Sequence, residues 1–243
     1  MSARYSTDYR QTISVGASQQ IAMSRFMSRT YGWMFLGLSL TGVVSYYLAS
    51  SDMAAQMIME HRGMFYGAMI AEVLLVMALT AAFQRLSAMT ATLGFLAYSA
   101  LNGVTLSMIF LAYTMTSIGQ VFFITAGMFG GLALFGTVTR KDLTGVGSFV
   151  GMGLWGLILV GLVNMFVRSE ALSMGLGAAG VLIFAGLTAY HAQTIRSMAY
   201  QYSSSGANQS EADKGAIFGA LMLYLNFINL FLSLLRLFGN RRE

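Results

Sequence analysis

The sequence contains no cysteine, no proline and few charged residues. Only 9% of its 243 residues are charged, whereas an average soluble domain carries about 25%. The absence of cysteine excludes disulfides, thiolate metal sites and thiol nucleophiles. The absence of proline removes the kink often found in transporter helices, so any break in a helix must come from glycine. So few charges cannot coat a water-facing surface, which argues against a soluble protein.

Hydrophobic residues make up 56% of the chain and gather in long apolar runs. Each run approaches the ~20 residues that cross a ~30 Å hydrocarbon core as a helix. The runs are apolar at consecutive positions, which excludes the alternating pattern of a membrane β-barrel. The sequence therefore predicts an all-α integral membrane protein with seven transmembrane helices, at residues 30–49, 63–83, 90–112, 118–137, 146–167, 171–190 and 216–238.

The domain organisation follows from the position of these runs. Residues 1–28 are polar and lack the apolar stretch that a signal peptide needs. We expect them to form a cytoplasmic tail, for which disorder is one expectation. Residues 29–243 contain no polar block large enough for a second domain, so they form one transmembrane domain.

The net charge of +5 indicates orientation rather than a nucleic-acid partner. A nucleic-acid binder clusters its basic residues on one face, whereas here they lie between the apolar runs. With the N-terminus inside, the cytoplasmic segments hold nine basic residues and the outside loops two, as the positive-inside rule requires. The nine are Arg4, Arg10, Arg25, Arg29, Arg85, Arg140, Lys141, Arg196 and Lys214, against Arg62 and Arg168.

The C-terminus breaks this rule. Seven spans place Arg236, Arg241 and Arg242 outside, where basic residues are unexpected. A partial or re-entrant last helix is the alternative.

Small residues recur four positions apart in several runs. This spacing lets two helix backbones approach closely, so packing is the favoured interpretation and no chemistry is assigned. The pairs are Gly127 with Gly131, Gly147 with Gly151, and Gly175 with Ala179.

Glu72 is the clearest candidate for a functional group inside the membrane. It lies nine residues into the second run, about 14 Å along a helix and therefore near mid-membrane. An ionisable group there must be protonated, paired or hydrated. Glu72 is either a proton or cation ligand, or a neutral acid hydrogen-bonded to a neighbouring helix. In both cases it should face the bundle interior.

Other polar groups inside the runs favour structural roles. Amides commonly join transmembrane helices by hydrogen bonds. The chain has four such amides, Asn102, Asn164, Asn226 and Asn229, and one histidine, His191, at the end of the sixth run. His61, beside Glu60 and Arg62, is interpreted as a surface residue. No phosphate loop, HExxH motif or pair of intramembrane aspartates is present, so we expect no enzyme, no cofactor and no metal site.

Four segments of the chain carry a recognisable family pattern. Residues 186–195 read GLTAYHAQTI, which resembles GLTAYDTQKI of the Bax inhibitor-1 family, proteobacterial branch. Residues 219–232 read GALMLYLNFINLFL and resemble GALxLYLDFINLFL, a long and specific match. Further support comes from YSALNGVTLS at 98–107 and TRKDLTG at 139–145.

The resemblance implies a seven-helix fold with the last helix central, in the bacterial inner membrane. Family members are described as cytoprotective proteins and as pH-sensitive calcium leak channels. Some bacterial members associate with a membrane-bound AAA protease. In the family an aspartate pair on the sixth and seventh spans shares a proton and senses pH, because two close carboxylates cannot both ionise cheaply.

This chain departs from the family at both aspartates, which are replaced by His191 and Asn226. The resemblance implies that these two residues meet. An imidazole and a neutral amide bind calcium poorly, since calcium favours carboxylate oxygens. The family-level expectation is therefore a pH-sensitive ion leak pathway or stress regulator, with calcium and protons as candidate ions. The alternative is a non-conducting regulator acting through partners such as a membrane-bound protease.

Overall fold

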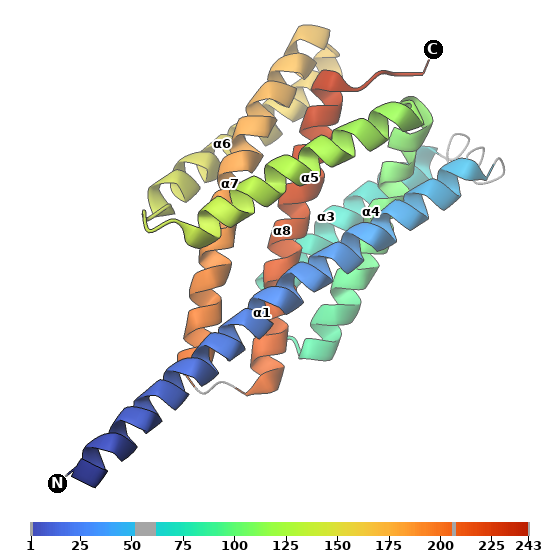
Figure 1. Cartoon of the computed structure of the whole chain (residues 1–243). Helices are drawn as coiled ribbons and strands as arrows, with labels where there is room; N and C mark the ends of the chain where they lie inside the picture. Colours follow the sequence, from blue (N-terminus) through green and yellow to red (C-terminus); the bar gives the residue numbers. More distant parts are fainter. Residues whose placement is uncertain (1, 52–61, 206–207, 243) are drawn as a thin grey trace.

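The computed structural model describes residues 2–51, 62–205 and 208–242, and this part of the chain is almost entirely helical (Figure 1). It contains seven α-helices and one short 3₁₀ helix, η1 at Phe83–Arg85. The α-helices are α1 (Ser2–Ser50), α3 (Arg62–Ala81), α4 (Ala88–Ala112), α5 (Met115–Val138), α6 (Thr144–Val167), α7 (Glu170–Ser204) and α8 (Gln209–Phe238). The expected all-α class is confirmed.

Polar residues define where four of the helices begin. The side chain of Ser87 accepts a hydrogen bond from the backbone N–H of Thr90 at the start of α4. Thr114, Ser169 and Asn208 do the same for α5, α7 and α8. Each cap satisfies a backbone donor that has no partner within the helix, so the short polar connections between apolar runs set the helix starts.

The helix α1 crosses the boundary expected at residue 28 between the tail and the transmembrane domain. It begins at Ser2 and continues through that position to Ser50, so the polar N-terminal segment is helical. Its N-terminal part extends beyond the ends of the other helices (Figure 1). The polar composition of this segment lowers its hydropathy without interrupting the helix, since it contains no proline.

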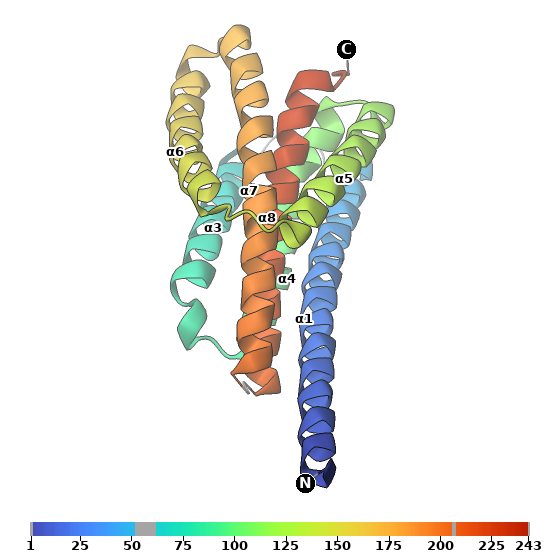
Figure 2. The same cartoon turned by 60° about the vertical axis from the view of Figure 1, so that its left-hand side comes forward.

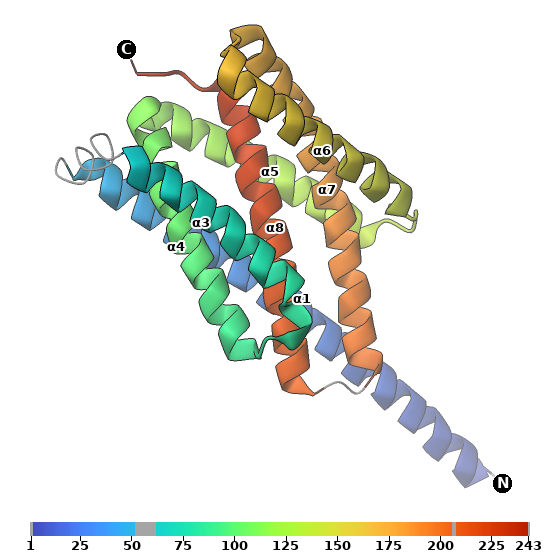
Figure 3. The same ribbon diagram turned by 180° about the vertical axis from the view of Figure 1, so that it is seen from behind.

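The last helix is the most buried candidate span. In α8, 72% of the residues in its apolar 18-residue stretch are buried, against 39% or less in the corresponding stretch of each other candidate span. The helix packs against α1, α4, α5 and α7. By contrast, α6 packs against α7 and α3 packs against α4, at the periphery of the bundle (Figures 2 and 3).

Six of the helices in the described residues are long and apolar enough to cross a membrane. The apolar part of α3 described by the structure, Tyr66–Ala81, is shorter than the others. Seven spans were expected. Many exposed residues of α6 are large and apolar, including Phe149, Trp155 and Phe166, which are 73%, 69% and 80% exposed. Such a surface is suited to lipid rather than to water.

Close contacts between helices occur at Gly136, which was not expected, and at Gly147, which was. A methyl group on Gly136 of α5 would collide with the backbone carbonyl of Ala189 on α7. Gly147 of α6 lies against the ring of Tyr190 in the same way. The expected packing is wrong at Gly127, Gly131, Gly151 and Gly175, where an added methyl group would meet no atom of the described residues within 4 Å. Spacing places small residues on one helix face, but it does not say whether a neighbour covers that face.

Candidate functional site

His191 and Asn226 meet between α7 and α8. The amide nitrogen of Asn226 lies 2.8 Å from Nδ1 of His191, which confirms the expected contact. Asn226 is only 3% exposed, and His191 is half-buried. Since an amide nitrogen can only donate, Nδ1 accepts and the ring carries its proton on Nε2. The pair is therefore an uncharged link between two helices.

The position of His191 corrects the expectation that it ends the sixth span. The helix α7 continues to Ser204, 13 residues beyond His191. It continues because Ala192, Ile195 and Ala199 recur on one face and are at most 1% exposed, although polar residues stand between them. Asn226 lies 17 residues after the start of α8, so the two antiparallel helices bring both residues to about the same height.

The residues that follow His191 hold the connection between α5 and α6. The side chain of Gln193 accepts from the backbone N–H of Leu143 at 2.9 Å and donates to the carbonyl of Lys141 at 2.7 Å. Arg196 donates to the carbonyl of Thr137 at 2.8 Å. Two of the segments that carry the family resemblance are thus joined through side chains. Sequence reasoning missed this role, although Gln193 and Arg196 were visible as polar residues after an apolar run.

Within the same connection, Asp142 stabilises the start of α6. Its carboxylate accepts from the backbone N–H of Thr144 at 2.9 Å and from the Thr144 hydroxyl at 2.6 Å. These bonds to the hydroxyl and the N–H lower the pKa of Asp142 from its ordinary value. The connection that carries Arg140 and Lys141 is therefore an ordered turn.

Glu72 forms the second polar cluster, and its hydrogen-bond partners among the described residues all lie on α4. One carboxylate oxygen accepts from the Tyr98 hydroxyl at 3.2 Å and from the amide nitrogen of Asn102. The other accepts from the Thr105 hydroxyl at 2.9 Å. These contacts show that Glu72 faces the neighbouring helix α4. Among the described residues the only salt bridge joins Arg29 to Asp213, so no basic side chain neutralises Glu72 there.

A cavity of about 580 Å³ reaches this cluster from the C-terminal end of the bundle. Its lining includes Glu72, Asn102 and Thr105 at one end and Arg236 and Arg241 at the other. Asn102 is 5% exposed, and its Oδ1 is a buried acceptor without a partner among the described residues. The cavity is large enough to hold water beside the other polar groups of this cluster. The arrangement therefore suits a hydrated acid in the membrane.

A hydroxyl network continues from this cluster into the core. The ring of Tyr98 lies edge-on to that of Tyr224 on α8, with centroids 5.8 Å apart. The Tyr224 hydroxyl lies 2.7 Å from Oγ1 of Thr41 on α1, which is also 2.7 Å from the carbonyl of Ser99. Three helices are joined at Thr41. Single threonine and tyrosine residues are common in apolar runs and do not stand out there. The sequence therefore did not indicate this network.

The remaining amides do not join helices as expected. Oδ1 of Asn164 accepts from the backbone N–H of Ser169 at 3.0 Å and closes the turn after α6. The amide of Asn229 donates to the carbonyl of Leu225 in its own helix at 2.8 Å. Asn102 and Asn226 do link helices. His61 and Glu60 lie outside the described residues, and of Arg62 only the backbone is described.

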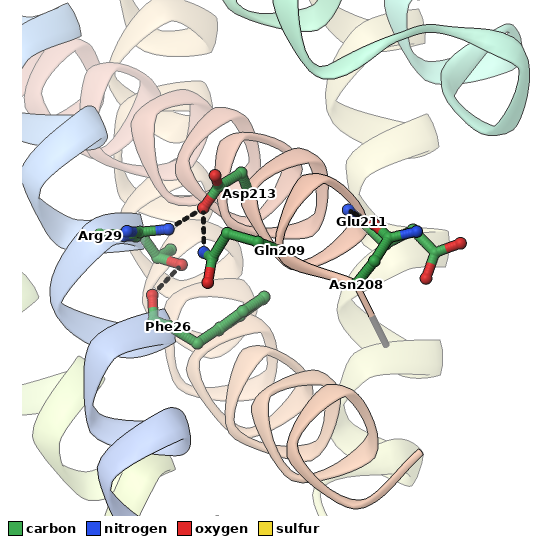
Figure 4. A network of polar contacts seen from close by, with 7 residues as sticks. Phe26, Arg29, Asn208, Gln209, Glu211 and Asp213 are labelled. Atoms are coloured by element: carbon green, nitrogen blue, oxygen red, sulfur yellow. Dashed lines mark hydrogen bonds and ion pairs between the residues drawn. The ribbon is translucent and has the colours of Figure 1, made fainter. Parts of the chain in front are cut away.

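A third polar cluster joins α1 to the start of α8. Figure 4 shows the Arg29 guanidinium directed at the carboxylate of Asp213, which also accepts from the amide of Gln209 at 2.9 Å. Asn208 in the same view caps α8 by accepting from the N–H of Glu211 at 2.9 Å. Both members of the salt bridge are substantially exposed, so it contributes little to stability.

Comparison with known proteins agrees with the residues that carry the resemblance. Residues 23–243 match the model of a family described as inhibitor of apoptosis-promoting Bax1. An inner membrane protein of Escherichia coli K12, YbhL, is 46% identical over 220 residues, 90% of this chain and 93% of the relative. An uncharacterized protein of Rickettsia prowazekii is 37% identical over 97% of this chain and 99% of its own. An uncharacterized membrane protein of Streptococcus pyogenes serotype M1 is 34% identical over 90% and 94%.

Proposed function

The chain belongs to the Bax inhibitor-1 family of membrane proteins, and from this membership and the geometry of Glu72 we propose that it provides a proton-responsive ion leak pathway in the inner membrane. The proposal includes seven membrane spans, with α8 at the centre of the other six, and no catalytic activity. Its ionisable group is Glu72, which exchanges a proton or binds a cation. Calcium is one candidate ion and the proton itself is the other.

The observation that carries this proposal is the cavity that ends at Glu72. A carboxyl group in hydrocarbon is costly unless it is hydrated or bonded. Here three side chains of α4 bond to it, and the cavity extends from it past Arg236 and Arg241 at the far end. Carboxylate, amide and hydroxyl oxygens are also the atoms that hard cations prefer. A transient opening on the other side of Glu72 would complete a pathway.

We propose that the pathway is closed at the hydroxyl network of Tyr98, Tyr224 and Thr41, which lies between Glu72 and the core of the bundle. Tyr224 is fully buried and Tyr98 is 4% exposed, so their rings separate Glu72 from the centre of the bundle. The uncharged pair of His191 and Asn226 lies on the other helix pair, α7 and α8. We propose that it closes this interface without the charge repulsion that a carboxylate pair would produce on ionisation.

Flux through liposomes tests the proposal. The purified protein is incorporated into vesicles, and calcium entry and proton entry are measured separately with trapped dyes between pH 6 and 8. Glu72→Gln should reduce the flux at least tenfold, while Glu211→Gln, the same change at an exposed acid, should leave it unchanged. Equal flux in Glu72→Gln, or no flux above that of protein-free vesicles, would refute a pathway through Glu72.

One observation favours the alternative of a non-conducting regulator that acts through partners such as a membrane-bound AAA protease. Both positions of the family's aspartate pair carry uncharged side chains that bond to each other, so the site lacks a carboxylate for calcium. This alternative predicts that no variant gives calcium or proton flux above that of protein-free vesicles. It also predicts that the protein changes the rate at which a purified membrane protease degrades a reference membrane substrate in the same vesicles.

A further inference from the structure

We propose that the C-terminal end of the bundle binds an anionic phospholipid, with the phosphate held by Arg168, Arg236 and Arg241 and one acyl chain in the groove between α6 and α7. Arg236 and Arg241 also line the far end of the Glu72 cavity, but this proposal rests neither on Glu72 nor on ion flux. The supporting observation is a polar cavity that adjoins an apolar groove.

The first hollow is a polar cavity of about 620 Å³ at the ends of α6 and α8. Three arginines line it, Arg168 after α6, Arg236 at the end of α8 and Arg241 in the segment that follows. Glu170 is the one acidic residue in the lining, so the lining is net positive. None of these three arginines is in a salt bridge with another described residue. Guanidinium groups suit phosphate because two parallel N–H groups can bond to two of its oxygens.

The backbone holds these arginines at the cavity. Arg168 ends α6 in the left-handed region, with φ 53°, a position that glycine usually occupies. The segment after α8 is tied to the connection between α4 and α5. The N–H of Asn240 donates to the Ser117 hydroxyl at 2.9 Å, and the N–H of Arg242 donates to the carbonyl of Ala112 at 3.0 Å. Arg241 between them is therefore anchored, while its side chain stays exposed.

The second hollow is an apolar groove of about 650 Å³ between α6 and α7. Ser169 lines both hollows, so the groove begins where the polar cavity lies. Gly156 and Gly175 form part of its wall, and an added methyl group on either would meet no atom within 4 Å. No described helix fills the groove. Along α6 it extends from Val167 to Gly153, about 21 Å, which exceeds the ~15 Å depth of one leaflet's hydrocarbon.

Charge and polarity together specify the occupant. A phosphate beside a long apolar chain is the structure of a phospholipid, and the net positive cavity favours a lipid of net negative charge. A free phosphate would use the cavity alone, and a second copy of the chain would use the groove alone. The proposal also accounts for the basic C-terminus, which violates the orientation rule, because arginines that bind lipid phosphate need to lie at that membrane surface.

Lipid-dependent thermal stability of the purified, delipidated protein tests the proposal. The probes are dioleoylphosphatidylglycerol, dioleoylphosphatidylcholine and inorganic phosphate, each added to the protein in detergent. Only phosphatidylglycerol should raise the midpoint of unfolding. Each change Arg168→Gln, Arg236→Gln or Arg241→Gln should weaken its apparent affinity about tenfold, since one charge-assisted contact is lost. Arg140→Gln, at the connection between α5 and α6, is the matched control and should have no effect.

Changes in the groove separate the lipid from the other occupants. Gly175→Leu should abolish the shift with phosphatidylglycerol, while Gly151→Leu, an open position of α6 that does not line the groove, should retain it. Ala179→Leu serves the same purpose if Gly175→Leu does not fold. A shift with inorganic phosphate that survives the groove changes would indicate a free-anion site and refute the proposal. So would equal shifts with both lipids, or a dimer that dissociates on Gly175→Leu without any change in lipid response.

Discussion

Nδ1 of His191 and the amide nitrogen of Asn226 lie 2.8 Å apart and join α7 to α8 at a point where both helices are tightly packed. The contact predicts a specific dependence of stability on Asn226. Replacing Asn226 by Ala should leave Nδ1 of His191 without its donor and destabilise the fold by about 0.6–2 kcal/mol, the range measured for hydrogen bonds between polar side chains of membrane helices. Circular dichroism during heating in detergent measures this change.

Asn229 provides the control for this experiment. It lies one turn later on α8, but its amide bonds to the carbonyl of Leu225 in its own helix. Asn229→Ala should therefore lower the unfolding midpoint much less than Asn226→Ala. Equal losses for the two variants would mean that the link between helices contributes nothing beyond the removal of an amide from α8.

A carboxylate pair at the same two positions should convert the site. The double change His191→Asp and Asn226→Asp places two acids within reach of each other, and these must share a proton at neutral pH. We expect calcium flux through liposomes to rise and to close on acidification. Either single change should do less, because one acid lacks the like-charged neighbour. Strong flux with acid-dependent closing in the unmodified protein would show that the conducting site does not need this pair.

The sequence predicted the helices best where apolar runs end at polar connections. The runs expected at 90–112 and 146–167 lie within two residues of the ends of α4 and α6. The predicted end of α7 was wrong. The polar residues Gln193 and Arg196 end the apolar run, whereas the helix continues on the buried face that carries Ile195. Hydropathy records composition, whereas a helix needs only one apolar face.

The candidate site was predictable in part, for physical reasons that differ between its members. Glu72 stood out because an acid in an apolar run needs a partner, but the sequence did not say which hydroxyls would supply it. The contact between His191 and Asn226 followed from the family resemblance and not from helix arithmetic, which misplaced the end of the helix. The arginines at 168, 236 and 241 come from distant parts of the chain, so only the fold shows that they share one cavity.

Orientation in the membrane can be tested cleanly because the chain has no cysteine. We expect the N-terminus and the connection with Lys141 to face the cytoplasm and Arg242 to face outward, from the distribution of basic residues and the opposite positions of the two termini (Figure 1). Lys141→Cys and Arg242→Cys each introduce a single thiol. A membrane-impermeant maleimide added to spheroplasts with an intact inner membrane should label Arg242→Cys, and should label Lys141→Cys only after lysis. Labelling of Lys141→Cys before lysis would reverse the orientation.

The contact of α5 with α7 predicts opposite effects for two glycines of one helix. A methyl group on Gly136 would overlap the carbonyl of Ala189, so α5 and α7 must separate to accept Gly136→Ala. Overpacking of this kind costs about 1–3 kcal/mol. The methyl group of Gly131→Ala meets no described atom within 4 Å. This change should be neutral or stabilise the helix by up to about 1 kcal/mol, because alanine loses less backbone entropy than glycine. Unfolding midpoints of the two variants in the same detergent decide the matter. A loss at Gly131 as large as that at Gly136 would place another surface against the open face of α5.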